Sequence, residues 1–328
     1  MYKFENIKSV HLELTNKCQA RCPMCPRRIH GGILNPLFNL AEIDLETFKK
    51  WFPVDFIKQL DRLFMCGNLG DPIIAQDCLL VFEYLRSINP NMDLSMHTNG
   101  SARTSQFWKG IADAGVRVVF GIDGLEDTHA IYRIGTDYNN VIENAQTFIQ
   151  AGGYAEWHML AFEHNEHQID GCRELSIKLG FKNFIVKHTS RFIDDKFYAL
   201  DESGKTNYIL KPTSHSKQII IKIKDASATV PTSITCKAVK SSEIYVSAEG
   251  AVTPCCWIDL TWGIPHWPKK IDYMDRIGEY PSLHKNTISE IFDSNYFEKI
   301  ESTWTDTPLL QCSEQCGNLD KLGSQFKD

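Results

Sequence analysis

Short apolar segments alternate with amphipathic ones through the first two thirds of the chain. The apolar segments are rich in β-branched or large apolar side chains and are bounded by turn-forming residues, a pattern that predicts β-strands. Six segments fit this description: Ser9–Leu14, Leu63–Cys66, Leu94–His97, Val116–Ile122, Ala155–Phe162 and Phe184–His188.

The intervening segments carry helix start and stop signals. Asp44 and Asp77 stand where an N-cap is expected, and Gly180 follows a helical stretch as a C-cap. The helices predicted in this way are Leu45–Phe52, Leu79–Ile88, Asn140–Gln150 and Glu166–Leu179.

This alternation predicts right-handed βαβ units and a parallel sheet. Six units are fewer than the eight of a closed (β/α)8 barrel, and a doubly wound open sheet shows the same alternation. Polar residues cluster just after each predicted strand, which favours a barrel with its active site at the carboxyl rim. The clearest of these polar groups are 67–72, 97–100, Asp123-Gly124, 163–165 and 189–191.

The alternation stops at about residue 195. Residues 196–235 contain no cysteine and are rich in serine, threonine and lysine, with an alternating stretch at 218–224. This composition predicts a linker with an edge strand whose lysines discourage unwanted pairing. A patch for an anionic substrate is the alternative interpretation of Lys205, Lys211, Lys217, Lys222 and Lys224.

Composition narrows the class of protein. The chain has 328 residues and a formal net charge of −6, which argues against a general nucleic-acid surface. The sequence has no apolar run of membrane-spanning length and no secretory segment, so we expect a cytoplasmic protein without membrane partners. Eleven cysteines in a reducing compartment are more often metal ligands than disulfides.

Three of these cysteines form a tight group directly after the first predicted strand. Cys18, Cys22 and Cys25 have the spacing C-x3-C-x2-C and no fourth cysteine close by in the sequence. A cubane [4Fe–4S] cluster takes one thiolate per iron, so three thiolates leave one iron open to a substrate or cofactor. A zinc site or three unrelated thiols are the alternatives, and the tight spacing favours the cluster.

A second group of cysteines begins at Cys236. A hairpin turning at Glu249-Gly250 would bring Cys236 and Cys255 to the same end, and a C-terminal C-x3-C pair would close the set. Four thiolates complete the shell of either zinc or a [4Fe–4S] cluster. Cys256 is an alternative to Cys255 as a ligand; otherwise it is a buried thiol, a hydrogen-atom donor or an exchangeable ligand. The predicted ligands are Cys236, Cys255, Cys312 and Cys316.

The cysteine triplet resembles the signature of the radical S-adenosylmethionine (radical SAM) superfamily, and the C-x13-G-x4-C segment resembles the opening of its SPASM domain. Five cysteines in this region, where a full SPASM domain has seven, favour the shorter "twitch" form with one auxiliary cluster. The resemblance implies an α/β fold, a partial (β/α)6 TIM-like barrel followed by a small cysteine-rich α+β domain. The implied segments are 1–195 for the barrel, 196–235 for the linker and 236–328 for the auxiliary domain.

The resemblance also implies contacts to SAM. Gly70-Asp71-Pro72 is similar to the "GGE" motif, and Phe120–Gly124 with His129 and Arg133 is similar to an SxDG…H…R pattern, with Gly121 in the place of a common serine. Arg133 and Arg191 are the candidates to pair with the methionine carboxylate, because guanidinium groups bind carboxylates well, and the position of Arg191 after the sixth predicted strand makes it the better candidate. The predicted cofactor-binding residues are Gly70, Asp71, Thr98, Asp123, Arg133 and Arg191.

The activity implied is that of a radical SAM oxidoreductase or a peptide- or small-molecule-modifying enzyme. SAM is cleaved reductively to methionine and a 5′-deoxyadenosyl radical, which abstracts a hydrogen atom from a substrate C–H bond. The implied partners are a peptide or small-molecule substrate and an electron donor such as flavodoxin or ferredoxin. The alternatives are a non-catalytic Fe–S or zinc protein and a sulfur-insertion enzyme that sacrifices its auxiliary cluster.

Overall fold

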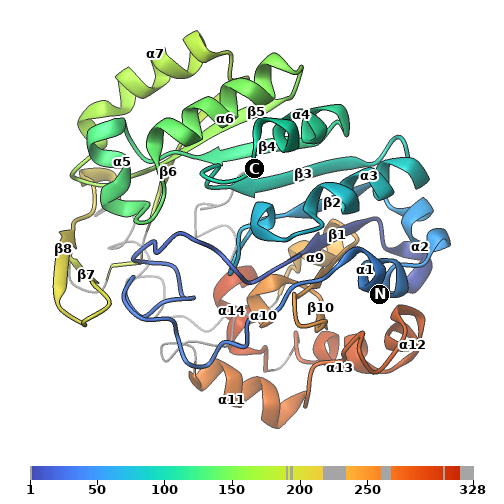
Figure 1. Ribbon diagram of the computed structural model, residues 1–328. Coiled ribbons are helices and arrows are strands. Elements are labelled where there is room, and N and C mark those ends of the chain that lie inside the picture. Colours follow the sequence, from blue (N-terminus) through green and yellow to red (C-terminus); the bar gives the residue numbers. More distant parts are fainter. Residues whose placement is uncertain are drawn as a thin grey trace.

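A computed structural model describes residues 2–189, 191–192, 195–216, 234–259, 267–305 and 307–317, with the backbone alone described at 267–270. Its centre is an eight-stranded sheet in the order β10-β9-β1-β2-β3-β4-β5-β6 (Figure 1). The six strands from β1 to β6 run parallel to their neighbours. They are β1 (Ser9–Leu12), β2 (Arg62–Met65), β3 (Asp93–Thr98), β4 (Arg117–Gly121), β5 (Ala155–Ala161) and β6 (Asn183–His188).

The six strands predicted from the sequence are confirmed, each within two residues at either end. Strand β1 shows why the strands could be predicted from the sequence: its successive side chains alternate between two different environments. Val10 and Leu12 are fully buried in the main hydrophobic core, whereas His11 and Glu13 point to the opposite side of the sheet. The partial (β/α)6 barrel is therefore confirmed, with an apolar outer side and a polar interior.

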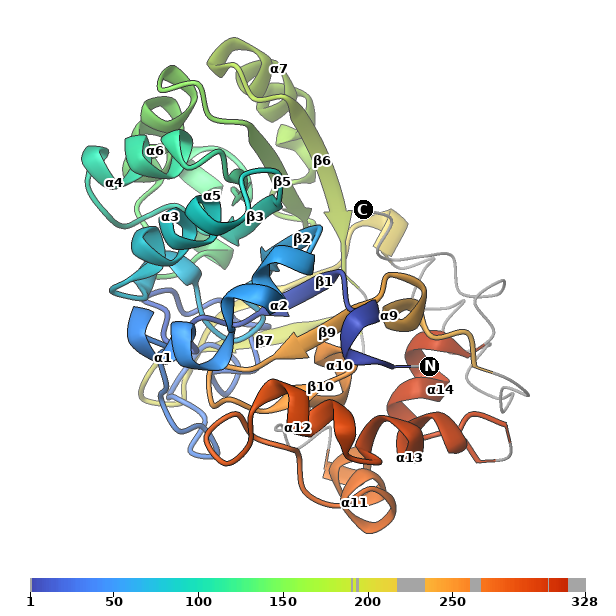
Figure 2. The ribbon, with the colours of Figure 1, turned by 90° about the vertical axis from the view of Figure 1, so that its right-hand side faces the viewer.

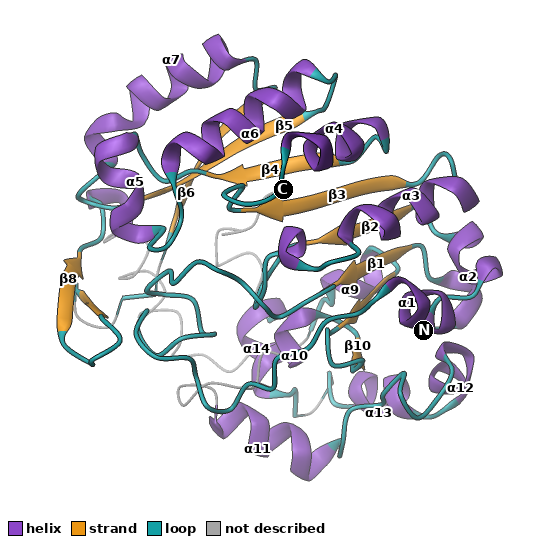
Figure 3. Cartoon of the chain, viewed as in Figure 1, coloured by secondary structure: helices purple, strands orange, loops and turns teal. Residues whose placement is uncertain are grey.

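Helices cover the outer side of the sheet (Figure 3). The predicted cap at Asp44 is confirmed, since its side chain accepts a hydrogen bond from the Thr47 backbone N–H, and Gly180 ends its helix in the left-handed conformation. Asp77 occupies the predicted N-cap position without capping its own helix and instead accepts a hydrogen bond from the Leu45 backbone. These helices are α1 (Leu45–Trp51), α2 (Val54–Gln59), α3 (Cys78–Ile88), α4 (Ser105–Asp113), α5 (Glu126–Tyr132), α6 (Tyr138–Gln150) and α7 (Ile169–Leu179).

Three single-turn 3₁₀ helices lie among these elements: η1 (Phe4–Asn6), η2 (Pro72–Ile74) and η3 (Glu166–Gln168). The third of them opens the predicted helix Glu166–Leu179, which the structure divides between η3 and α7. The core between helices and sheet is built largely from aromatic side chains, among them Trp108, Phe120 and Phe148.

The predicted C-terminal hairpin is present, and it extends the barrel sheet instead of standing apart from it. Strand β9 (Glu243–Val246) pairs in parallel with β1, and β10 (Val252–Thr253) returns antiparallel to β9. The barrel and the cysteine-rich C-terminal region therefore share one continuous sheet.

Helices of the C-terminal region gather beside this hairpin (Figure 2). They are α9 (Lys237–Lys240), α10 (Cys256–Asp259), α11 (Trp267–Arg276), α12 (Ile288–Asp293), α13 (Tyr296–Ser302) and α14 (Leu310–Cys316). Among the residues described, no helix has the length and apolar character needed to cross a bilayer.

Part of the segment predicted as a linker is ordered into a second, two-stranded sheet. Strands β7 (Phe197–Leu200) and β8 (Thr206–Leu210) form a hairpin, and the Leu200 backbone N–H bonds to the carbonyl of His30 near the cysteine triplet. In the predicted lysine patch, Lys211 forms an exposed ion pair with Glu163. The predicted edge strand at 218–224 and Lys217, Lys222 and Lys224 lie outside the described residues.

Candidate functional site

The cysteine triplet lies in the loop that follows β1. Cys22 is buried, and Cys18 and Cys25 are half-buried beside it. A tight turn joins the last two, since the Cys25 backbone N–H bonds to the Cys22 carbonyl at 3.0 Å. The loop packs on a small apolar cluster that includes Tyr132 and Phe162. The structure thus places the three predicted thiols together, at the carboxyl end of a barrel strand.

A buried arginine holds this loop in shape. The Nη2 atom of Arg27, whose residue is 4% exposed, donates to the carbonyls of Cys18 and Ala20 at 2.6 and 2.7 Å. Two carbonyls that would otherwise lack donors are thereby satisfied by a charged group. Sequence reasoning missed Arg27, because one arginine after a cysteine motif gives no sign that it is buried.

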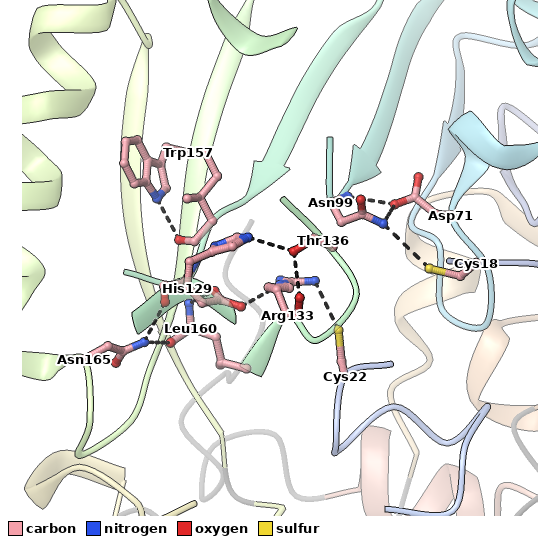
Figure 4. A network of polar contacts seen from close by, with 12 residues as sticks. Cys18, Cys22, Asp71, Asn99, His129, Arg133, Thr136, Trp157, Leu160 and Asn165 are labelled. Atoms are coloured by element: carbon pink, nitrogen blue, oxygen red, sulfur yellow. Dashed lines mark hydrogen bonds and ion pairs between the residues drawn. The ribbon is translucent and has the colours of Figure 1, made fainter. Parts of the chain in front are cut away.

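Asn99 connects the triplet to the loop after β2 (Figure 4). Its Nδ2 atom donates to Asp71 Oδ2 at 2.5 Å and lies 3.7 Å from Cys18 Sγ, while its backbone N–H donates to the same Asp71 oxygen at 2.7 Å. Gln19 adds a bond from Nε2 to Asn99 Oδ1 at 2.8 Å. Asp71 therefore orients Asn99, a residue that the sequence did not single out from its Thr98-Asn99-Gly100 turn.

Two other predicted cofactor residues have local structural roles. A Cβ atom at Gly70 would lie 2.0 Å from the Thr15 carbonyl oxygen, so only glycine allows the two backbone segments to approach here. Thr98 ends β3, and its hydroxyl accepts a hydrogen bond from the Gly100 backbone at 3.0 Å.

An ion pair lies on the other side of the triplet. Asp123 is fully buried; its Oδ2 atom accepts from Arg133 Nε at 2.6 Å and its Oδ1 atom from the Leu160 backbone at 2.7 Å. Arg133 Nη1 lies 4.0 Å from Cys22 Sγ. Burial lowers the pKa of Arg133, but Asp123, Cys22 and Tyr132 together more than offset this effect and raise the pKa.

The same arginine explains the glycine that replaces a serine in the motif. A Cβ atom at Gly121 would lie 2.5 Å from Arg133 Nη2, so a larger residue would displace the guanidinium from this position. Arg191, the other candidate for a carboxylate, is exposed and donates from Nη1 to the Met24 carbonyl at 3.1 Å.

Burial keeps two thiols of the triplet, those of Cys18 and Cys22, protonated. Desolvation raises the pKa of Cys22 to about 11, with Arg133 partly offsetting it, and burial likewise raises the pKa of Cys18. Without a bound cation these thiols stay protonated at neutral pH. Metal loading releases thiol protons, so a cluster and the nearby Arg133 favour the thiolate forms that ligation requires.

The second cysteine set also comes together. Four cysteines, Cys236, Cys255, Cys312 and Cys316, line one pocket at the end of the β9–β10 hairpin. A hydrogen bond between Cys236 and Cys316 lowers the pKa of Cys316 to about 6 and raises that of Cys236. In the described part of the chain no three Cys, His, Asp or Glu side chains are gathered as ligands around a single ion.

The adjacent Cys255 and Cys256 diverge at the start of α10. Cys255 faces the pocket with the three other cysteines. Cys256 instead hydrogen-bonds to His11 on the interior side of β1. The sequence predicted Cys255 as the ligand with Cys256 as the alternative, and in the structure it is Cys255 that lines the pocket.

Comparison with known proteins gives matches for the barrel portion and for the overall fold. Residues 12–170 match the radical SAM superfamily, a stretch that contains the triplet, the Asp71 loop and the Asp123–Arg133 pair. A curated relative, the GTP 3′,8-cyclase of Saccharophagus degradans, is 29% identical over 146 residues. The match spans 44% of this chain and 42% of the relative, so less than half of the relative's length is covered.

Solved structures share the fold over nearly the whole chain. SuiB of Streptococcus suis bound to S-adenosylmethionine superposes with a TM-score of 0.60 at 12% identity, covering 98% of this chain and 76% of SuiB. The protein anSMEcpe, with bound AdoMet and the Cp18Cys peptide, gives 0.56 at 15% identity and covers 98% of this chain and 91% of anSMEcpe. SuiB has also been solved with its precursor peptide SuiA bound.

Proposed function

We propose that this chain is a radical SAM enzyme that uses SAM to abstract a hydrogen atom from a substrate C–H bond, a proposal supported by the match of residues 12–170 to the radical SAM superfamily. The observation that carries the proposal is the loop after β1, where Cys18, Cys22 and Cys25 pack on one apolar cluster at the carboxyl rim of a partial barrel. In barrels of parallel strands this rim is the usual place for an active site.

The donor set suits a [4Fe–4S] cluster with one open iron. Such a cluster, once bound and reduced, supplies the electron that cleaves SAM to methionine and a 5′-deoxyadenosyl radical. The chain's own residues position it: Cys18, Cys22 and Cys25 would hold three irons. Arg27 fixes the loop backbone, while Asn99 and Arg133 lie beside two of the sulfurs.

The predicted SAM contacts divide into three kinds. Asp71 and Asp123 act through the residues that they orient, Asn99 and Arg133. Because Arg133 already has a carboxylate partner, Arg191 is the better candidate to pair with the methionine carboxylate. Gly70 and Thr98 would shape the backbone beside the cofactor.

An auxiliary [4Fe–4S] cluster in the second pocket completes the proposal. Cys236, Cys255, Cys312 and Cys316 would give it four thiolates, as in a twitch domain at 236–328 that follows the barrel at 1–195 and the linker at 196–235. A complete cysteine shell disfavours sacrifice of this cluster for sulfur insertion. A flavodoxin or ferredoxin would supply electrons.

The substrate is a peptide or a small molecule of a biosynthetic pathway, which the enzyme oxidises or rearranges. Fold relatives solved with bound peptides, SuiB and anSMEcpe, support the peptide class. The curated relative, a GTP cyclase by name, supports the small-molecule class, and its match is confined to the barrel portion of this chain.

Anaerobic reconstitution followed by iron and sulfide analysis tests the cofactor content. Two clusters give about eight irons per chain. We expect Cys22→Ala and Cys316→Ala each to lose about half of that iron, because each removes a ligand of a different cluster. Zinc at the second site, or a loss of all iron in either variant, contradicts the assignment of two separate clusters.

SAM cleavage separates this function from a non-catalytic metal protein. With dithionite and SAM, the reconstituted protein should form 5′-deoxyadenosine. A metal-loaded protein that forms none is a binding protein, and the enzyme proposal fails.

A further inference from the structure

The side-chain amide of Asn99 directs an N–H group at one sulfur of the cysteine triplet. Its Nδ2 atom carries two hydrogens, and it lies 2.5 Å from Asp71 Oδ2 and 3.7 Å from Cys18 Sγ (Figure 4). Gln19 Oε1, 3.4 Å from the same nitrogen, shares the hydrogen that is not bonded to Asp71. The Cys18 sulfur therefore has a hydrogen-bond donor beside it before any metal is bound.

The neighbours of this amide determine which of its two ends is the donor. The Ser101 backbone N–H donates to Asn99 Oδ1 at 3.0 Å, and Gln19 Nε2 donates to the same oxygen at 2.8 Å. A backbone N–H can only donate and a carboxylate can only accept. With its ends exchanged, the amide would place its NH2 group against Ser101 and its oxygen against Asp71. The nitrogen therefore belongs on the side of Cys18.

The donor and the sulfur are held in the same buried framework. Asn99 is 3% exposed and Asp71 is 4% exposed. The Asp71 backbone N–H donates at 2.9 Å to the carbonyl of Lys17, the residue before Cys18. Arg27 holds the Cys18 carbonyl itself. Because the Asp71 loop and the triplet loop are bonded to each other, the distance between the Asn99 amide and the sulfur is fixed by the protein.

Metal binding makes this contact more favourable. In the unloaded protein the Cys18 thiol lies 3.8 Å from Gln19 Oε1, to which its hydrogen can be donated. A ligating thiolate has lost that hydrogen and can only accept. Hydrogen bonds to charged acceptors are stronger than those between neutral groups. The Asn99 N–H group therefore suits the metal-bound form of Cys18 better than the free thiol.

From this geometry we infer that Asn99 raises the reduction potential of the cluster held by the triplet, by donating a hydrogen bond to the Cys18 thiolate, with Asp71 as the positioning residue. The inference rests on the proposed function and deepens it. Hydrogen bonds to the sulfurs of a cluster stabilise its reduced, more negative form and so raise its potential. The step concerned is the transfer of one electron from the flavodoxin- or ferredoxin-class donor, in which no bond is formed or broken.

Arg133 is the less suitable residue for testing such an effect. Its Nη1 atom lies 4.0 Å from Cys22 Sγ, and its charge is paired with the buried carboxylate of Asp123. Replacing Arg133 would remove one charge and leave another unpaired, so a change in potential would have two causes. Asn99 is neutral, and its replacement by alanine leaves the formal charge of the site unchanged.

A redox titration of the reconstituted holoenzyme without SAM, followed by electron paramagnetic resonance (EPR), tests the inference. The EPR signal that changes when SAM is added afterwards identifies the triplet cluster, because that cluster is the one with an open iron. We expect Asn99→Ala to lower the midpoint potential of this signal. At the wild-type midpoint the ratio of reduced to oxidised cluster should fall about tenfold, which is about 59 mV for a one-electron couple.

Asn144→Ala is the matched control. Asn144 is a buried asparagine of α6 whose Nδ2 atom donates to the carbonyls of Gly100 and Ala102 at 2.8 and 3.2 Å. It thus holds the same turn after β3 as Asn99 does, through atoms that are not part of the triplet loop. We expect this variant to be less stable and to keep the wild-type potential. An equal shift in both variants would mean that movement of the turn changes the potential, which overturns the inference.

Pulsed EPR of the wild type provides a second test that needs no variant and so does not depend on the folding of Asn99→Ala. With asparagine labelled with nitrogen-15, the reduced triplet cluster should show a coupling to the Asn99 nitrogen across the contact with Cys18. Absence of this coupling overturns the inference, as does a wild-type potential in Asn99→Ala. Both results leave the proposed function intact. A protein whose EPR signals do not respond to SAM contradicts the proposed function instead, and the inference falls with it.

Discussion

Asp123 is a buried carboxylate that holds Arg133 in position. With no exposed side-chain surface it depends on Arg133 and the Leu160 backbone for compensation, and Gly121 provides the space in which the guanidinium lies. A buried carboxylate that loses its cation is strongly destabilising, whereas loss of both charges is less so. The ion pair therefore fixes Arg133 beside Cys22, and the Arg133 charge compensates for the free-energy cost of burying the Asp123 carboxylate.

Replacement of Arg133 tests this interpretation. We expect Arg133→Ala to lower the free energy of unfolding by about 3 kcal/mol, because it leaves the Asp123 carboxylate buried and unpaired. The double variant with Asp123→Asn should recover part of the loss. The ion pair of Arg62 and Asp93, 3.7 Å apart and with side chains 36% and 51% exposed, serves as the control, and Arg62→Ala should cost less than about 1 kcal/mol. Urea unfolding measures all three, and a double variant no more stable than Arg133→Ala contradicts the account.

His129 makes the protein sensitive to acid. Its Nδ1 atom accepts from the Asp123 backbone N–H at 3.2 Å and its Nε2 atom bonds to Thr136 Oγ1 at 3.0 Å, an arrangement that fits a neutral ring. Burial lowers the pKa of His129 to about 4, against about 6.5 in an unfolded chain. Between these values the unfolded chain binds a proton that the native protein does not, so the free energy of unfolding falls as the pH falls from 6.5 to 4.

His129→Gln should remove this contribution. From pH 7 to pH 5 the wild type should lose about 2 kcal/mol more of its free energy of unfolding than the variant does, as urea unfolding at both values would show. His167→Gln, at an exposed position on η3, is the control and should follow the wild type. An equal decline in His129→Gln and the wild type would mean that the native ring takes up its proton near the ordinary value.

At the scale of single residues, the sequence predicted which cysteines group together better than it predicted the residues around them. The cysteine groups could be recognised because their spacing is visible in the sequence alone. Arg27 and Asn99 matter because of burial and long-range contact, since Asn99 meets Asp71 and Cys18 only after three strands have paired. Arg133 was expected to face a ligand carboxylate, and it pairs with Asp123 because that carboxylate is buried within reach.

Among the elements, the β9–β10 hairpin determines where the auxiliary cysteines lie. Its turn depends on Gly250, which has a φ of +80°. A Cβ atom there would lie 2.9 Å from the Trp51 ring of α1, so both backbone conformation and packing require glycine. The glycine of the C-x13-G-x4-C pattern therefore has a physical reason that spacing alone does not reveal.

A comparison of two glycine variants separates the effect of backbone conformation from the effect of packing. Gly250→Ala and Gly152→Ala both place a side chain at positive φ, but nothing lies within 4 Å of a Cβ at Gly152. We expect Gly152→Ala to cost about 1 kcal/mol from backbone strain alone, and Gly250→Ala to cost about 1–3 kcal/mol more from overpacking against Trp51. Gly250→Ala should also lower iron at the second site selectively. Equal losses of stability in the two variants would show that the Trp51 contact is unimportant.

The strands were the most predictable elements, because each combines an apolar segment with turn residues at both ends. The pairing of β9 with β1 was not predictable, since it joins segments more than two hundred residues apart through backbone hydrogen bonds that leave no periodic signature. The β7–β8 hairpin was missed for a related reason: its exposed side chains resemble those of a linker, and Tyr198 and Ile209 remain solvent-exposed.

For the whole molecule, the shared sheet is the main consequence of the fold. The triplet follows β1, the auxiliary pocket adjoins β9 and β10, and β1 and β9 are direct neighbours. Two groups of cysteines built on adjacent strands keep a fixed relation to each other and to the barrel interior. The proposed function assigns one cluster to each group, so the shared sheet would also fix the two clusters relative to each other.

The most direct test of the central claim is the amount of 5′-deoxyadenosine formed from SAM by the reconstituted, dithionite-reduced protein. The wild type should form it, Cys22→Ala should form none, and Cys316→Ala, which alters only the auxiliary pocket, should still form it. Formation of 5′-deoxyadenosine by Cys22→Ala at the wild-type level, or its absence from the wild type, would contradict the assignment of SAM cleavage to the triplet after β1.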